Sequence, residues 1–165
     1  MNGLESGVRE VKRVEHEVCV GVIVATACRP MHCTVARQLS VAIENQPGRL
    51  ASICHKLAEH HINIRDLTVV DNIEQGMIRL IPSDAALCKQ LLSDAGLYVI
   101  EAEVLVVILK DFPGQLAALS DAMASAQINI DYAYGTEDSS EKEMRMVFKV
   151  SHLSRAREVI ESLPG

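Results

Sequence analysis

Hydrophobic positions in this chain follow a strand-like alternation in some segments and a helix-like period of about 3.6 residues in others. Residues 38–44 alternate and contain branched side chains, which predicts a strand. The next segment predicts an amphipathic helix, with one stripe formed by Leu50, Ile53, Cys54, Leu57, Ala58 and His61. Residues 62–70 alternate again, with one slip near Asp66, and predict a second strand.

The pattern then predicts two more strands with a helix between them. Residues 76–81 form the third strand, and Asp84 can cap the helix that follows. The apolar stripe of that helix is Ala85, Cys88, Leu91 and Leu92. Gly96 ends the helix, and a fourth strand begins at Leu97. The predicted order over residues 38–102 is therefore β-α-β-β-α-β.

The same order of elements returns 66 residues later. Residues 41–70 and 107–136 align without a gap, and nine of the thirty pairs are identical. The identical pairs include the Pro-Gly of the first turn and the Ile-Asn-Ile that opens the second strand. A fixed offset that keeps the turn residues indicates two copies of one supersecondary unit.

The repeat divides the chain into an N-terminal extension (1–37), a first unit (38–102) and a second unit (103–165). Units of roughly 65 residues are marginal alone, so we expect the two to share a sheet or a face. The second unit ends without a fourth strand, which would expose the edge of its first strand. Two interpretations of the extension stay open: residues 17–27 form a strand that fills this place, or the residues before Met31 are a leader.

Composition argues against several classes of function. The formal net charge is -6, with no Trp, three Tyr and two Phe, so clustered cations and stacking side chains for nucleic acid are lacking. The longest apolar stretch, residues 18–27, is too short to span a bilayer, and no secretory signal is evident. Five irregularly spaced Cys favour reduced thiols, and we expect a cytoplasmic protein.

Metal and catalytic chemistry have weak support. Metal-type residues gather twice, at Cys28, His32 and Cys33 and at His55, His60 and His61. The first group lacks the paired spacing of zinc sites, and the second does not share a helical face. No nucleophile motif, phosphate loop or carboxylate pair stands out. We therefore predict no catalytic residue, no metal and no cofactor.

The motif x-N-x-P-G-x-L, followed by a helix and by I-N-I on the next strand, resembles the ACT domain. The first copy reads Glu44-Asn45-Gln46-Pro47-Gly48-Arg49-Leu50, and the second reads Lys110-Asp111-Phe112-Pro113-Gly114-Gln115-Leu116. The resemblance covers about residues 38–163. As a short tandem, the chain is similar to the small bacterial proteins made of two ACT domains. The resemblance implies an α+β fold of tandem ferredoxin-like βαββαβ units, with helices packed on one face of antiparallel sheets.

In the amino-acid-binding ACT domains, the ligand lies at an interface between two modules, where the first turn and the start of the first helix meet residues of the second strand. The resemblance implies ligand-binding residues Asn45, Gln46, Pro47, Gly48, Arg49, Leu50 and Asn63 in the first copy, and Asp111, Gly114, Gln115, Leu116 and Asn129 in the second. A helix N-terminus suits a carboxylate, and a Gly lets the backbone approach it. Alternatively, Asn45 only caps its turn, and Asn63 ties strand to helix.

The match to the serine-binding members of the family is incomplete. Their His two residues before the first Asn is Ile43 here, so the resemblance does not extend to serine itself. In the second copy Asp111 replaces Asn45, and a carboxylate suits an ammonium group better than a carboxylate ligand. We therefore expect the two sites to differ in preference or occupancy.

These features predict a regulatory protein that senses a free amino acid at the interface between its ACT repeats and modulates a metabolic enzyme. We expect it to form a homodimer and to bind neither nucleic acid nor membrane. The alternative is a regulatory subunit of an amino-acid biosynthetic enzyme, such as acetolactate synthase, that needs no ligand of its own.

Overall fold

A computed structural model of the chain describes residues 31–72, 75–138 and 142–164. This part of the chain contains six strands and four helices. In chain order they are β1 (His32–Glu44), α1 (Arg49–Glu59), β2 (Ile64–Asn72), β3 (Gln75–Pro82), α2 (Ala85–Asp94), β4 (Val99–Lys110), α3 (Gln115–Ser125), β5 (Ile130–Asp138), β6 (Glu143–Val150) and α4 (Leu153–Ser162). The predicted α+β class and the tandem βαββαβ arrangement are confirmed.

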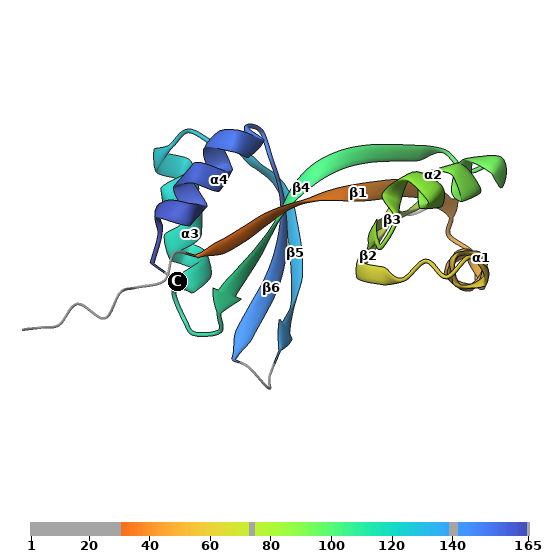
Figure 1. The fold of residues 1–165 in the computed structure, drawn as a ribbon, viewed down its shortest axis with the longest axis horizontal. Coiled ribbons are helices and arrows are strands. Elements are labelled where there is room, and N and C mark those ends of the chain that lie inside the picture. Colours follow the sequence, from red (N-terminus) through yellow and green to blue (C-terminus); the bar gives the residue numbers. More distant parts are fainter. Residues whose placement is uncertain (1–30, 73–74, 139–141, 165) are drawn as a thin grey trace, which may run out of the picture.

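The strands form one continuous antiparallel sheet in the order β2-β3-β1-β4-β6-β5. Figure 1 shows that this sheet twists strongly at its centre, so that the two ends separate into two units. One unit contains α1 and α2, and the other contains α3 and α4. Sharing one sheet gives each small unit a larger core than it would have alone.

The two central strands each belong to both units. β1 pairs with β4 over ten positions, from His32 opposite Ile108 to Val41 opposite Val99. Only the second half of β1 pairs with β3, and only the second half of β4 pairs with β6. The first half of β4 is thus the fourth strand of the first unit, and the first half of β1 is the fourth strand of the second.

This pairing places residues 32–38 where the second unit was expected to lack a strand. The predicted boundary between residues 37 and 38 falls inside β1, and the strand hypothesised at 17–27 lies outside the described residues. The pairing of β1 with β4 follows the repeat. Val99 is the counterpart of Cys33, and Val107 is the counterpart of Val41, each 66 residues later. Cys33 pairs with Val107, and correspondingly Val99 pairs with Val41. The structural repeat therefore begins near residue 31 and again near residue 97.

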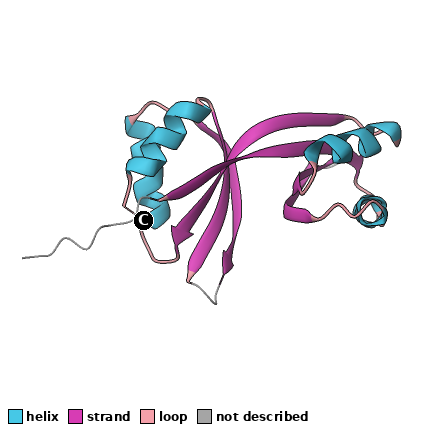
Figure 2. Ribbon diagram, viewed as in Figure 1, coloured by secondary structure: helices cyan, strands magenta, loops and turns pink. Residues whose placement is uncertain are grey.

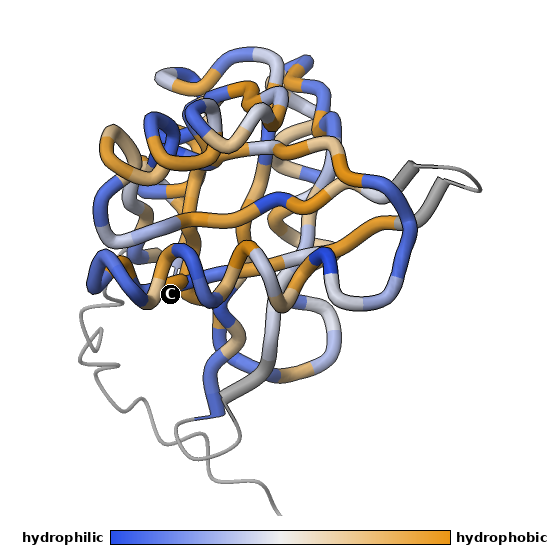
Figure 3. Tube along the Cα trace, turned by 90° about the vertical axis from the view of Figure 1, so that its right-hand side faces the viewer, coloured by the Kyte–Doolittle hydropathy of each residue, from blue (hydrophilic) through white to orange (hydrophobic). Residues whose placement is uncertain are grey.

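Each unit packs its helices on one face of the sheet and has its own apolar core (Figure 2). The first core joins α1 and α2 to the strands through Leu39, Val41, Ile53, Leu57, Ile62, Ile78, Leu80, Cys88 and Leu92. The second is formed by Met31, Cys33, Leu105, Val107, Leu109, Leu119, Met123, Ile128, Met146, Phe148, Val150, Ala156 and Ile160. Figure 3 shows hydrophobic residues concentrated along the inner strands, with polar residues on the outer turns.

The helix-free faces of the two units pack against each other through a third cluster. Its apolar part is Ile81, Val104, Val106 and Val147. Beside it, the Arg145 guanidinium donates to both carboxylate oxygens of Asp66 at 2.8 and 2.9 Å. The Arg79 guanidinium lies 4.3 Å from the ring centroid of Tyr132. Asp66 and Tyr132 are repeat counterparts, as are Arg79 and Arg145. The edge strand of each unit therefore contacts the equivalent arginine of the other unit.

Gln38 completes this contact between the units. Its side chain is fully buried, and its Nε2 donates to the Tyr132 hydroxyl. The Tyr134 hydroxyl donates to Gln38 Oε1 at 2.9 Å. Burial, with the nearby charge of Asp66, raises the pKa of Tyr134, so this hydroxyl remains a hydrogen-bond donor. The buried amide is therefore satisfied on both its nitrogen and its oxygen.

Candidate functional site

The predicted turns adopt the backbone conformation that their Pro-Gly sequences favour. Gly48 has φ 88° and precedes α1, and Gly114 has φ 100° and precedes α3. Residues with a side chain rarely adopt this left-handed backbone conformation, whereas glycine adopts it without strain. Neither helix has a side-chain cap at this end. The first turn of each helix is therefore uncapped by side chains, as a site for a ligand carboxylate requires.

The predicted ligand residues of the first turn lie at the surface. Asn45, Gln46, Pro47, Gly48 and Arg49 are exposed, and Leu50 is half-buried against the first core. Arg49 forms an ion pair with Glu44, the last residue of β1. In the second turn, Asp111, Gly114 and Leu116 are exposed and Gln115 is half-buried. Both turns are open to a ligand or to another chain.

The Asn of each Ile-Asn-Ile segment anchors its strand through the backbone. Asn63 N–H donates to Ser83 Oγ at 3.0 Å, and Ser83 N–H donates to the Asn63 carbonyl at 2.8 Å. The second unit repeats both bonds between Asn129 and Ser151, at 3.0 and 2.9 Å. The backbone thus ties the strand to the segment before α2 or α4, while both Asn side chains stay exposed.

A single chain does not bring the turn and Asn63 together. Glu44 lies opposite Gln75 on β3, and Gln75 lies opposite Asn72, the last residue of β2. Asn63 precedes Ile64 at the other end of β2, opposite Pro82. At about 3.3 Å per residue, the length of β2 separates Asn63 from the turn by more than 20 Å. The same register separates Asn129 from the second turn.

The two turns also lie far from each other. The first follows the C-terminal end of β1, and the second follows the C-terminal end of β4. Because these long strands are antiparallel, the turns occupy opposite ends of the molecule, next to α1 and α3 in Figure 1. No pocket within one chain can include both.

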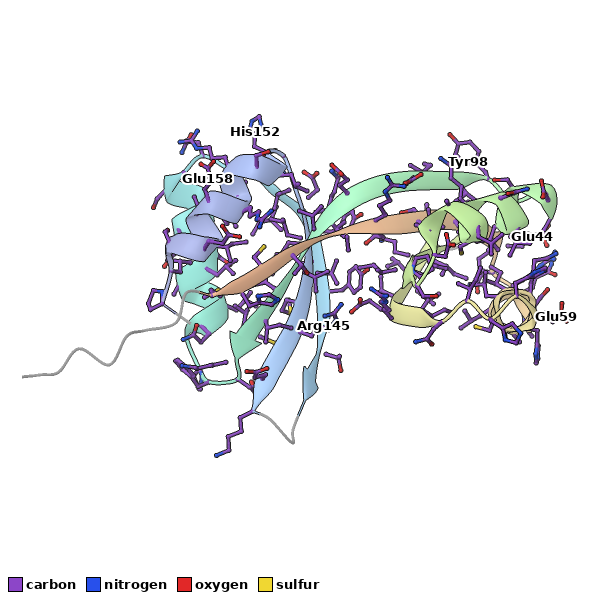
Figure 4. All side chains as sticks on the ribbon, in the orientation of Figure 1. Glu44, Glu59, Tyr98, Arg145, His152 and Glu158 are labelled. Atoms are coloured by element: carbon purple, nitrogen blue, oxygen red, sulfur yellow. The ribbon has the colours of Figure 1, made fainter. Side chains whose placement is uncertain are left out.

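The structure also contains a groove that was not predicted from the sequence. It lies between α1 and the end of α2, with a volume of about 320 Å³. Its polar lining is Glu44, Arg49, Ser52, Lys56 and Tyr98, and its apolar lining includes Ile43, Ile53, Leu92 and Leu97. Figure 4 shows Glu44 and Tyr98 at the α1–α2 end of the molecule. Among these residues, only Arg49 was predicted to contact a ligand.

Other chemistry finds little support among the described residues. They contain no group of three or more His, Cys, Asp or Glu placed to hold a metal ion. Burial raises the pKa of the Cys33 and Cys88 thiols from 9.0 to about 11, so both are weak nucleophiles. Within the same ranges, no helix is long and apolar enough to cross a membrane.

Residues 33–163 match the family model of the ACT domain pair. The chain belongs to this family. A search of curated protein sequences found no match.

Solved structures share this ACT-pair architecture. A crystal structure from Bacteroides thetaiotaomicron is 28% identical, with 77% of this chain and 87% of that chain covered and a TM-score of 0.71. The ligand-free regulatory subunit of aspartate kinase from Thermus thermophilus is 18% identical over 77% and 95% of the two chains, with a TM-score of 0.58. The Thermus flavus subunit is 20% identical over 79% and 92%, also with a TM-score of 0.58.

Proposed function

We propose that this ACT pair is a cytoplasmic regulatory protein that binds a free amino acid between two copies of the chain. The observation that supports it most is the separation of the turn and Asn63 at opposite ends of β2. If two copies pair their β2 edges antiparallel, Asn63 of each comes to the turn-bearing end of its partner. A homodimer would therefore create two equivalent sites from residues that one chain keeps apart.

The side chains of β2 favour pairing through the first unit. β2 is an edge strand that pairs only with β3 among the described residues. Leu67, Val69 and Val70 remain 39%, 48% and 43% exposed along it. An exposed edge strand with apolar side chains favours association with another strand. The counterparts on β5 are Ala133, Gly135 and Thr136, which offer far less apolar surface.

The chemistry of the proposed site suits an α-amino acid. The uncapped start of α1 would receive the carboxylate, while the amides of Asn45 and the partner's Asn63 would bind the polar groups. The space beside Gly48 is open to a ligand, since a Cβ built there would meet nothing within 4 Å. In the second unit, Asp111 would prefer an ammonium group, and the Asn129 amide already donates to Asp131 at 2.9 Å. The first unit is therefore the proposed sensor.

The regulated target is proposed to be a metabolic enzyme. The Thermus subunits with this fold are regulatory chains of aspartate kinase. A ligand that ties two chains together favours one arrangement of the dimer, and a bound enzyme that distinguishes the arrangements responds to it. Nothing in the site provides for turnover of the ligand.

The test is a calorimetric screen of the full chain against the twenty amino acids, combined with sedimentation to measure the dimer. We expect one amino acid or a small set to bind and to favour the dimer. Asn63→Ala should weaken binding by about tenfold, since one hydrogen bond to a charged group is lost. The matched Asn129→Ala should change it less than twofold. Binding of no amino acid would favour the ligand-independent subunit, such as that of acetolactate synthase, and equal losses in both variants would contradict the site.

A further inference from the structure

The groove between α1 and α2 is built within one chain and shares only Arg49 with the residues predicted to bind an amino acid. Its volume of about 320 Å³ is at the small end of the range for ligand pockets, roughly 300–1,000 Å³. The floor is apolar, with Ile53 and Leu92 from the first core and Leu97 packed against it. A ligand of this groove must be small and have an aliphatic part.

The charges around the groove leave one cation without a partner. Arg49 and Glu44 pair with each other, so their charges largely offset. Lys56 lies two helical turns after Arg49 on the same stripe of α1, and it lines the groove. Its ammonium forms no hydrogen bond or ion pair with the rest of the described chain. An anionic group that enters the groove would therefore find an available donor above an apolar floor.

The second unit serves as an internal comparison for this groove. The apolar floor position Ile53 stays apolar, as Leu119. The polar positions all change: Glu44, Arg49, Ser52 and Lys56 correspond to Lys110, Gln115, Ala118 and Ala122. α3 packs well without these groups, with Leu119 and Met123 fully buried. The fold therefore does not need them, and their presence in the first unit requires another reason.

We infer that this groove binds a small amphipathic carboxylate, with the carboxylate at Lys56 and the aliphatic part over Ile53 and Leu92. The ligand needs no second chain, because all the lining residues come from α1, α2, the end of β1 and the turn between α2 and β4. Since α1 also presents the first turn, a bound carboxylate would stabilise the helix that the proposed amino-acid site uses.

The test uses the full chain with two probes of equal length, hexanoate and hexylamine, followed by chemical-shift perturbation. We expect hexanoate to shift the resonances of Lys56, Tyr98 and Leu92, and hexylamine to shift none of them. Lys56→Ala should weaken hexanoate binding by about tenfold, whereas Lys56→Arg should keep most of it. The control Arg155→Ala, which removes an exposed cation from α4, should leave the affinity unchanged.

The outcomes separate this groove from the amino-acid site. Asn63→Ala should leave hexanoate binding intact, so the groove can bind its ligand even if the amino-acid proposal fails. The inference is overturned if hexanoate produces no shifts at the groove, if hexylamine binds equally well, or if Lys56→Ala binds as tightly as the unaltered chain. Retained melting temperatures of both Lys56 variants would show that the comparison concerns folded protein.

Discussion

At the scale of single residues, burial sets the reactivity of the cysteines. Cys33 lies in the second core and Cys88 in the first, and burial raises the pKa of both thiols to about 11. Charges of Glu161 and Asp84 act in the same direction. Both side chains therefore remain protonated thiols at neutral pH and behave as small apolar groups. Cys54 on α1 is only partly buried.

We expect iodoacetamide at pH 8 to modify Cys54 well before Cys33 or Cys88. The folded chain also holds these two protons up to about pH 11, whereas the unfolded chain releases them near pH 9. The free energy of unfolding should therefore fall as the pH rises from 9 towards 11. Mass spectrometry of digested protein and urea unfolding across this range measure both effects. Alkylation of Cys33 as fast as Cys54 would contradict the prediction.

At the scale of elements, the shared strands make each unit depend on the other half of the chain. Residues 32–38 complete the second unit's sheet, and Met31 and Cys33 are buried in its core. Met31 N–H also donates to the Leu163 carbonyl at 3.1 Å, which ties the start of β1 to the end of α4. The second unit thus cannot be cut from the chain at the predicted boundary without losing a strand.

We expect a chain that begins at Leu39 to melt at least 10 °C below one that begins at Met31. Loss of three buried side chains (Met31, Cys33 and Gln38) and of the first half of β1 lowers the free energy of unfolding by several kcal/mol, and each kcal/mol shifts Tm by roughly 2–4 °C at this size. Differential scanning calorimetry measures the comparison. Equal melting temperatures would show that the second unit is stable without the first half of β1.

At the scale of the whole molecule, the contact between helix-free faces fixes how the units are oriented. Asp66 has 9% of its side chain exposed and accepts both hydrogen bonds of Arg145, which Figure 4 shows on β6 between the units. Asp66 lies three residues after Asn63, just past the register shift between Ile64 and Asp66. Its ion pair therefore joins the start of β2 to β6 of the second unit.

We expect Asp66→Ala and Arg145→Ala each to lower the free energy of unfolding by about 1–3 kcal/mol, because each leaves a charge without its partner. The double variant should lose clearly less than the sum, since both changes break one interaction. Arg37→Ala is the control: Arg37 is exposed, and Glu101, 3.5 Å away, keeps its second partner Lys89, so the loss should be under about 0.5 kcal/mol. Additive losses at Asp66 and Arg145 would contradict a coupled pair.

Much of the fold could be predicted from residues whose role is local. The Pro-Gly turns, the helix stripe through Ile53 and Leu57, and the Asp84 cap all have the predicted structure, since Asp84 accepts from the Leu87 N–H at 3.0 Å. The role of residues 32–38 could not be predicted in this way. Among residues 32–37, only Ala36 is identical to its counterpart in 98–103. Many sequences can form a strand, whereas few can form a left-handed turn, so the repeat is visible at the turns and not in this strand.

Two copies of a βαββαβ unit and membership of the ACT family follow from local patterns, since period, turns and helix stripes depend on neighbouring residues. The sharing of β1 and β4, the separation of Asn63 from the first turn and the position of Lys56 in a groove are visible only in the folded chain. These features depend on which distant strands pair and how the sheet twists. The pairing of strands that lie far apart in the sequence depends on the packing of the whole chain, so it cannot be predicted from a local pattern.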